Sequence, residues 1–191
     1  MTSRRQAEAR TAPLDAAAWV AGALEMLADG GIDAVRVEPL AKALGVTKGS
    51  FYWHFADRRA LLDAMLARWS EGRIAAIRQQ AERREPPEAV LRHLAALYTR
   101  HTNPRGLAIE IAIRSLARTD KPAAKAVRAV DEGRLRLVAA LFGGLGWKPA
   151  DAQARALLFY SYLFGESLLD TRAVDAQTRA RAVETLLTPP R

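Results

Sequence analysis

The sequence predicts an all-α protein, and three observations support this prediction. Ala, Leu, Arg and Glu, which favour helices, dominate nearly every segment. The clusters of β-branched residues that strands prefer are missing. Turn signals of Gly and Pro separate segments with helical periodicity, which gives about nine helices. These signals are Gly30-Gly31, Gly45, Pro86-Pro87, Asn103-Pro104, Lys121-Pro122, Gly143-Gly144 with Gly146, and Pro149.

Three short helices are expected in the first 60 residues. The first runs over about 14–28, with one apolar face of Val20, Ala23, Leu24 and Leu27. The second lies near 38–44, where Pro39 fits the first turn because no intrahelical N–H bond is lost there. Gly45 permits a tight turn after it. Thr47 begins the third helix, because its hydroxyl can accept from the exposed N–H groups of the next turn.

A long helix follows, with Asp57 as its N-cap and apolar residues continuing to Trp69 and on towards Arg83. Five more helices are expected near residues 90–101, 109–116, 124–145, 150–170 and 176–187. We therefore divide the chain into a flexible basic arm over 1–12, a helix-turn-helix module over 13–60 and a larger helical domain over 61–191.

Residues 40–62 read LAKALGVTKGSFYWHFADRRALL. Leu40 and Ala41 in the short helix, the Gly45-Val46 turn and the run from Thr47 to Phe55 match one pattern in register, and the match continues to Leu62. This segment resembles the TetR family of bacterial repressors. About nine matched positions in a helical context are specific, whereas a bare helix-turn-helix pattern is weak. The resemblance implies a homodimer that binds double-stranded operator DNA and is released by a small-molecule inducer.

The residue order suits a helix that enters the major groove from Thr47. Its N-terminal residues would be exposed, while Val46, Phe51 and Phe55 would face inward. Lys48 can donate to guanine acceptors or to phosphate, and Gly49 lets the backbone approach the groove closely. Side chains such as Tyr52 can donate to phosphate oxygens. The expected DNA contacts are Thr47, Lys48, Gly49, Ser50, Tyr52, Trp53, His54, Arg58 and Arg36.

Several of these residues have a second interpretation. Tyr52 and Trp53 are alternatively packing aromatics, and His54 is alternatively an ordinary surface histidine. The N-terminal arm either enters an adjacent minor groove through its arginines or is a solubilising tail; these are Arg4, Arg5 and Arg10. Arg36 stands where the family usually has a hydroxyl residue. The missing cap would cost the second helix about 1 kcal/mol unless Asp33 or another group supplies it.

The C-terminal domain carries no diagnostic motif, so its site residues are inferred from helical faces. Six polar groups could point into an apolar pocket and bind a small molecule: His101, Glu110, Arg114, Asp131, Tyr160 and Glu166. An internal salt bridge or a solvated face is the alternative for each of them.

The stretch LLFYSYLFGESLL, residues 157–169, is apolar almost all round, so a helix there must be covered on more than one side. A second copy of the chain is the expected cover, with Leu158, Tyr162, Phe164, Gly165 and Leu169 in the interface. The alternative is a central core helix in a monomer.

The formal net charge is +8, but only +1 of it belongs to residues 1–60, where 8 basic residues face 7 acidic ones. Net charge therefore does not locate a DNA-binding surface. The sequence contains no Cys and no apolar run of the roughly 20 residues that a membrane span requires. An apolar block does not directly follow the N-terminal arginines, so no secretory signal is expected. A soluble cytoplasmic protein without a membrane partner fits these observations.

The three histidines form no metal-ligand cluster in the sequence, and no phosphate-binding or dinucleotide-binding pattern is present. We therefore expect a regulator rather than an enzyme, without a cofactor or metal. An all-helical carrier or enzyme that does not bind DNA is the main alternative. An activator, or a regulator without a ligand, is the second.

Overall fold

The computed structural model describes residues 14–99, 103–169 and 173–188, and all regular structure in these ranges is helical. The all-α prediction is confirmed. The helices are α2 (Ala16–Ala34), α3 (Val37–Ala43), α4 (Lys48–Phe51), α5 (Arg58–Ala81), α6 (Pro87–Thr99), α7 (Pro104–Leu116), α8 (Lys121–Gly144), α9 (Pro149–Leu168) and α10 (Ala176–Leu187).

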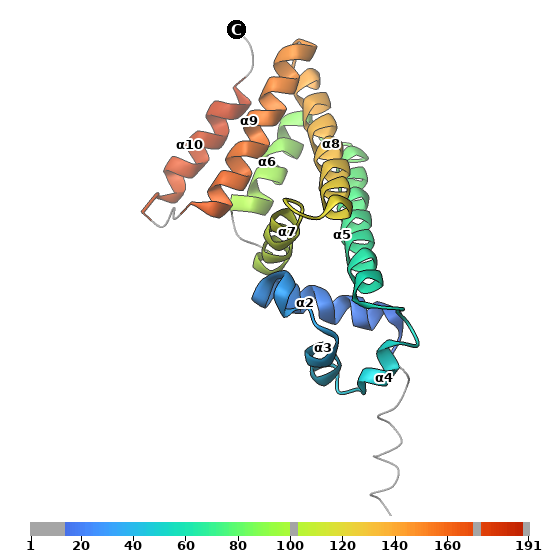
Figure 1. Ribbon diagram of the computed structural model, residues 1–191. Helices are drawn as coiled ribbons and strands as arrows, with labels where there is room; N and C mark the ends of the chain where they lie inside the picture. The colour runs from blue at the N-terminus through green and yellow to red at the C-terminus, as the bar shows by residue number, and fades with distance from the viewer. Residues whose placement is uncertain (1–13, 100–102, 170–172, 189–191) are drawn as a thin grey trace, which may run out of the picture.

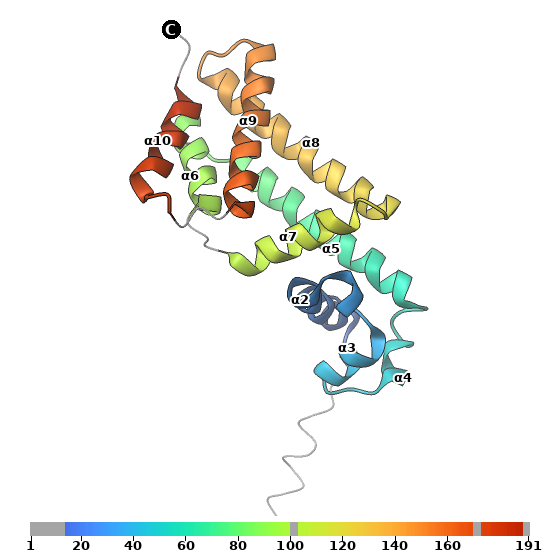
Figure 2. The ribbon, with the colours of Figure 1, turned by 60° about the vertical axis from the view of Figure 1, so that its left-hand side comes forward.

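The helices form a small unit and a larger bundle (Figure 1). Helices α2, α3 and α4 lie at one end of the molecule, and α5 leads from them into the bundle of α6, α8, α9 and α10. Helix α7 crosses between α2 and the bundle, as Figure 2 shows from a second side. Both α5 and α7 therefore join the small unit to the larger one.

Side chains cap the starts of most helices. The predicted caps are confirmed at Thr47, which accepts from the Ser50 amide, and at Asp57, which accepts from the Ala60 amide. Asn103, Asp120 and Asp175 have the same role for α7, α8 and α10. Each of these bonds satisfies an N–H group that has no partner within its helix.

The first helix is longer than predicted. Helix α2 starts at Ala16 and continues through Gly30, and Gly31 interrupts it with φ +68° and ψ −167°. One more helical turn then ends at Ala34. The Gly30-Gly31 pair therefore does mark a break, because a glycine without Cβ adopts positive φ without strain.

The prediction that Arg58 contacts DNA is corrected by the contacts of its side chain within the protein. Its guanidinium faces the protein, where Nε donates to the carbonyl of Val35 at 2.6 Å and a terminal nitrogen donates to that of Ile32 at 2.7 Å. These carbonyls follow the break at Gly31 and would otherwise lack a donor of this strength. These two hydrogen bonds connect the start of α5 to the end of α2, and they occupy the guanidinium group of Arg58.

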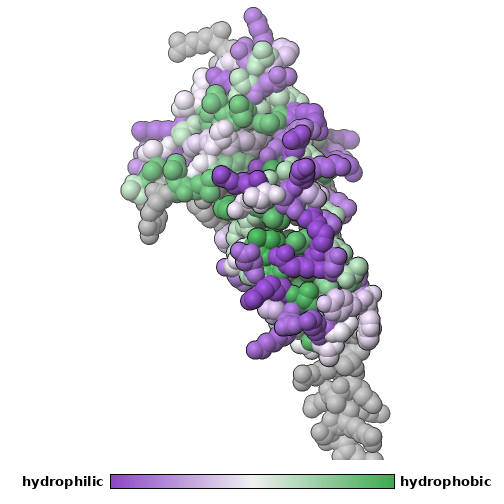
Figure 3. All heavy atoms as spheres, in the orientation of Figure 1, coloured by the Kyte–Doolittle hydropathy of each residue, from purple (hydrophilic) through white to green (hydrophobic). Residues whose placement is uncertain are grey.

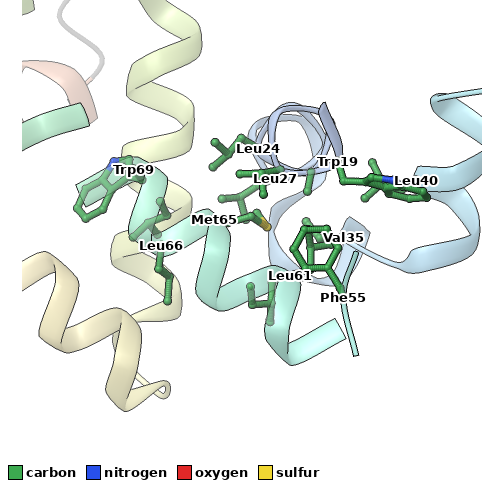
Figure 4. Packing of buried hydrophobic residues seen from close by; sticks show 14 of the residues in the cluster. Trp19, Leu24, Leu27, Val35, Leu40, Phe55, Leu61, Met65, Leu66 and Trp69 are labelled. Atoms are coloured by element: carbon green, nitrogen blue, oxygen red, sulfur yellow. The ribbon is translucent and has the colours of Figure 1, made fainter. Parts of the chain in front are cut away.

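The first hydrophobic core joins α2, α3 and α4 to α5. Figure 4 shows Leu24 and Leu27 of α2 facing Leu61 and Met65 of α5. Trp19 and Phe51 are completely buried, and their rings meet edge to face with centroids 5.3 Å apart. This core continues into Ile113, Ala123 and Val130, so it also packs against α7 and α8.

A second core lies among α6, α8, α9 and α10, around the buried side chains of Leu91, Phe142, Phe159 and Leu163. None of the described helices is long and apolar enough to cross a membrane.

Candidate nucleic-acid interface and effector cavity

Helices α3 and α4 place one end of the small unit at the surface. Gly45 has φ +70° and makes the turn between them, as the sequence predicted. Helix α4 has one buried side, where Phe51 packs against Trp19 of α2. Lys48 and Gly49 lie on its exposed side. The same short helix therefore anchors itself in the core and presents its first residues to the outside.

Two aromatic side chains next to α4 are exposed. Trp53 exposes 78% of its surface and Tyr52 exposes 53%, although the Tyr52 ring touches Phe51 edge to face. The packing alternative is therefore wrong for Trp53 in this chain. Tyr and Trp are enriched at interfaces, because they combine a large apolar ring with one polar group.

Lys48 has a charged neighbour that the sequence analysis did not single out. Its ammonium donates to the Glu38 carboxylate of α3 at 2.6 Å, and this hydrogen bond raises the pKa of Lys48 and lowers that of Glu38. Both side chains are more than half exposed. Arg36, Lys42 and Tyr52 line the same shallow hollow beside them. A pair ten residues apart on two helices is fixed by the turn geometry, which sequence spacing alone does not reveal.

Of the remaining predicted interface residues, Arg36 lines this hollow, Thr47 and Gly49 are exposed, and Ser50 and His54 are half-buried. Arg36 is exposed at the N-terminus of α3, and its side chain makes no capping bond, so the predicted missing cap is confirmed. Ser50 donates from its hydroxyl to the Thr47 carbonyl at 2.8 Å. A Cβ added at Gly49 would have one neighbour, the Thr47 Oγ1 at 3.8 Å. The protein interior therefore does not require glycine at this position.

The second candidate site is an ion cluster around Glu110 of α7. The Glu110 carboxylate is 2% exposed and accepts from Arg134 of α8 at 2.7 and 3.0 Å. It also accepts from Arg114 at 2.9 Å and lies 3.1 Å from Nε of Arg73 on α5. Arg114 in turn donates to Asp131 of α8 at 2.5 and 2.8 Å. Burial acts to raise the pKa of Glu110, but the three arginines outweigh it and hold the pKa below its ordinary value.

Two cavities adjoin this cluster and share Arg134 and Tyr160 as walls. The first has a volume of about 200 Å³ and reaches Arg73, Tyr98 and Glu110. The second has a volume of about 380 Å³ and is bounded by Arg114, Asp131 and apolar side chains of α7, α8 and α9. Tyr98 and Tyr160 meet edge to face with centroids 6.4 Å apart.

The structure thus brings together Glu110, Arg114, Asp131 and Tyr160 from the predicted ligand set. Glu166 stands apart, because it is buried in an ion pair of 2.5 Å with Arg179 of α10. His101 lies outside the described residues. Sequence reasoning missed Arg73 and Arg134, although an arginine inside an otherwise apolar helical stripe, as Arg134 is, was the available signal. Within the described ranges, no three His, Asp or Glu side chains lie close enough together to hold a metal ion.

Comparison with known proteins gives matches to the N-terminal segment by sequence and to nearly the whole chain by fold. Residues 20–65 match the model of the bacterial regulatory proteins of the tetR family. The class A tetracycline repressor from transposon 1721 of Escherichia coli is 44% identical over 46 residues, which are 24% of this chain and 21% of that protein. The sequence match thus spans about a fifth of that curated relative's length.

Solved structures of transcriptional regulators share the fold at low sequence identity. One from Rhodococcus has a TM-score of 0.74 at 19% identity, covering 91% of this chain and 94% of that one. AibR, solved with isovaleryl coenzyme A and operator DNA, has a TM-score of 0.66 at 21% identity over 92% and 99%. A regulator from Saccharomonospora viridis in complex with choline has a TM-score of 0.72 at 14% identity over 88% and 91%.

The buried Glu110 predicts a pH-dependent loss of stability in the variant Glu110→Gln. Removing the carboxylate leaves Arg134 buried without its partner, which costs about 3–5 kcal/mol of unfolding free energy at pH 7. Because the folded-state pKa lies below 4.5, the stabilising effect is complete above that pH and is lost as pH falls through the folded value. The difference between variant and wild type should therefore shrink in acid.

Urea unfolding of both proteins at one protein concentration, at pH 7 and at steps below pH 4.5, measures this effect. Glu88→Gln is the matched control, because Glu88 pairs with Arg92 on the exposed side of α6 and its loss should cost at most about 1 kcal/mol. A difference for Glu110→Gln that stays constant with pH would contradict the prediction.

Proposed function

We infer that this chain, which belongs to the TetR family of bacterial regulatory proteins by its residues 20–65, is a DNA-binding transcriptional regulator that responds to a small molecule. The observation that carries the proposal is the outer face of α4 and the residues after it. Lys48, Gly49, Tyr52 and Trp53 are exposed there on a helix whose opposite side is anchored by Phe51. That arrangement suits insertion into a major groove.

We propose that some of the exposed residues contact base edges and that others contact phosphate oxygens. Lys48 suits a base edge, where it can donate to the guanine acceptors N7 and O6 once the duplex displaces Glu38 from it. Tyr52 and His54 suit phosphate oxygens, because hydroxyl and imidazole N–H groups donate there without reading sequence. Thr47, Ser50, Trp53 and Arg36 remain proposed contacts on the same face. Lys42 joins them because it lines the hollow beside Lys48. Arg58 does not, because its guanidinium is used inside the module.

We propose that the chain acts as a homodimer through α9 and α10. Leu158, Tyr162 and Gly165 follow one another at helical spacing along α9, and Leu169 is the C-cap of this helix; Leu158 and Leu169 are more than half exposed. A Cβ at Gly165 would meet nothing within 4 Å, so a second helix can approach the backbone closely there. Hydrophobic residues gather over α9 on the face shown in Figure 3. Two of the proposed residues also pack within the chain: Phe164 against Tyr98 and Arg114, and Tyr162, whose hydroxyl lies 3.5 Å from the Arg179 carbonyl of α10.

A dimer places two copies of α4 on one duplex, so we propose a palindromic operator with half-site centres about one helical turn or a little more apart. We further propose that the regulator is a repressor, released from the operator when a ligand fills the cavities beside Glu110. The regulators of similar fold are described with isovaleryl coenzyme A and with choline, whose charges are opposite. The fold therefore supports a ligand-binding role without selecting the ligand. The division into a module over 13–60 and a domain over 61–191 is part of the same proposal.

Two helices support a route from the cavities to the DNA-binding module. Helix α5 is continuous from Arg58 past Gly72, and its Arg73 contacts both Glu110 and the Gly106 carbonyl of α7. Helix α7 in turn carries Arg105, which pairs with Glu25 and Asp29 of α2. A ligand that shifts the ion cluster would act on both helices. The duplex fixes the spacing of its grooves, so a small shift of the two α4 helices would break contacts in both half-sites.

A carrier or enzyme without DNA binding is the competing proposal, since the same cavities would suit it. Selection of bound sequences from random duplex DNA separates the two proposals. Recovery of a palindromic site supports the regulator, and failure to enrich any sequence from a folded dimer supports the carrier.

Lys48 and Tyr52 should affect operator binding in different ways. Lys48→Ala is expected to weaken binding by about 1–3 kcal/mol and to relax the preference at one position in each half-site. Tyr52→Phe should weaken all sequences to the same extent, because a phosphate contact carries no sequence information. Fluorescence anisotropy at one fixed salt concentration measures both. Lys125→Ala, which removes an exposed charge from α8, is the control. Unchanged affinity in both test variants would remove α4 from the interface.

The proposed dimer predicts that Leu158→Glu yields monomers. A carboxylate in the centre of an apolar helix–helix contact loses its hydration without gaining a partner, which opposes association. Sedimentation at micromolar concentration should give wild type at twice the chain mass of 20.9 kDa and the variant at that mass. Ile74→Glu, at a half-exposed position on α5, should remain dimeric. A monomeric wild type would refute the dimer.

The proposed route through α7 predicts that Arg105→Gln weakens the response to ligand more than it weakens folding. The pairs of Arg105 are exposed and screened by solvent, so their loss should change the free energy of unfolding little. In wild type, operator DNA should weaken ligand binding by the same factor that ligand weakens operator binding, about 5–150-fold for an ordinary coupling. Calorimetric titration of a ligand found by screening, with and without operator duplex, measures this factor. A factor unchanged by the substitution would leave α5 as the route.

A further inference from the structure

The charges around Glu110 do not balance. Arg73, Arg114 and Arg134 contribute three positive charges, and Glu110 and Asp131 contribute two negative charges. These five residues come from α5, α7 and α8, and α6 and α9 add only uncharged side chains to the walls of the two cavities. The cluster therefore carries a net charge of +1 beside a half-enclosed space.

An excess positive charge in such a place is unfavourable without a counterion. Arg134 pairs with Glu110 and Arg114 pairs with Asp131, so the excess charge falls on Arg73, whose side chain is 30% exposed. The carboxylate of Glu110 already accepts from Arg114 and Arg134 and is ion-paired with Arg73, so three guanidinium groups share its single negative charge. The cluster is thus arranged to accept one more negative charge.

Two tyrosine hydroxyls give a second, independent indication that the first cavity binds a hydrogen-bond acceptor. Tyr160 exposes 7% of its surface and lines both cavities, and Tyr98 lines the first cavity. Neither hydroxyl has a hydrogen-bond partner among the residues that the structure describes. Burial raises the pKa of both phenols, so they remain protonated at neutral pH and can only gain by donating to an acceptor.

The rest of the first cavity is mostly apolar, although Gln80 and Asn103 also line it and the side-chain oxygen of Gln80 is buried without a hydrogen-bond partner among the described residues. Ala76, Ile77, Leu94, Leu107 and Leu137 surround it from four helices. Its volume of about 200 Å³ accommodates a compact body such as one phenyl ring or a short branched chain. Arg73, Arg134 and the two tyrosines contribute the cationic and hydrogen-bonding part of the wall, and these aliphatic side chains contribute the hydrophobic part.

We propose that this cavity binds a small organic monoanion, a carboxylate on a compact apolar body, as the effector of the proposed regulator. The carboxylate lies against the guanidinium groups of Arg73 and Arg134 and accepts from Tyr98 and Tyr160, while the apolar body fills the space among α5, α6, α7 and α8. Only the role of this anion as an effector rests on the proposed function. The preference of the cavity for an anion follows from its lining residues and does not depend on the proposed function.

Three probes of one shape and different charge test the proposal. Phenylacetate is the anion, phenylacetamide its neutral isostere and phenethylamine the cation. Calorimetry on the full chain at pH 7 should show phenylacetate binding at least about tenfold more tightly than the amide, with no binding of the amine, because charge-assisted bonds to arginine are the stronger ones. Equal affinities, or a preference for the amine, overturn the proposal. So does a failure of phenylacetate to bind at millimolar concentration.

Substitutions at the cavity wall locate the binding site. Tyr98→Phe and Tyr160→Phe keep the packed rings and remove one donor each, so phenylacetate should bind about tenfold more weakly in each variant. Arg73→Gln removes the excess charge and should abolish the preference for the anion over the amide. Arg92→Gln is the matched control, since Arg92 is an exposed arginine of α6 that pairs with Glu88 and Glu184 away from the cavity. Phenylacetate affinity that is the same in all four variants would overturn the site.

Operator binding measured on the same preparations separates this inference from the proposed function. A chain that binds a selected duplex but treats the three probes alike retains the regulator and refutes the anion site. A chain that prefers phenylacetate but enriches no DNA sequence retains the anion site and refutes the regulator.

Discussion

The buried carboxylate of Glu110 joins α5 to the consecutive helices α7 and α8. It receives arginines from α5, from its own helix α7 and from α8, and both it and Arg134 are almost completely buried. Such an arrangement is weak evidence for stability as such, because well-packed hydrophobic residues of the same volume would often stabilise the fold equally. The main structural effect of these ion pairs is on the arrangement of the helices. The guanidinium planes fix the relative positions of α5, α7 and α8 around the two cavities.

That geometry also connects the cavities to the opposite end of the molecule. Arg73 contacts α7 from α5, and both helices continue to the small unit, where α5 shares a core with α2 and α7 holds α2 through Arg105. Within the small unit, Arg58 donates to the carbonyls of Ile32 and Val35, which follow the break at Gly31. Arginine is suited to each of these places, because its planar group donates several bonds in fixed directions.

The face of α4 is shaped by two opposite requirements. Phe51 and Phe55 must be buried to hold a helix of four residues in place, and Lys48, Gly49, Tyr52 and Trp53 are left exposed by the same turn. A short helix has little stability of its own, so its position depends on the aromatic contacts with Trp19. The Lys48–Glu38 pair holds the exposed lysine over the hollow beside α3.

The sequence by itself determined the helices, the Gly45 turn, the caps at Thr47 and Asp57 and the inward face of Phe51, because caps, turns and helical periodicity act between residues a few positions apart. Only the tertiary structure decided that Arg58 turns inward, that Phe164 packs within the chain and Leu158 outside it, and that Arg73 and Arg134 meet at Glu110. The partners in that cluster are 24 and 37 residues from Glu110, and no local pattern records which faces of α5, α7 and α8 come together. That choice follows from how the helices pack to bury their apolar surfaces, which is a property of the whole chain.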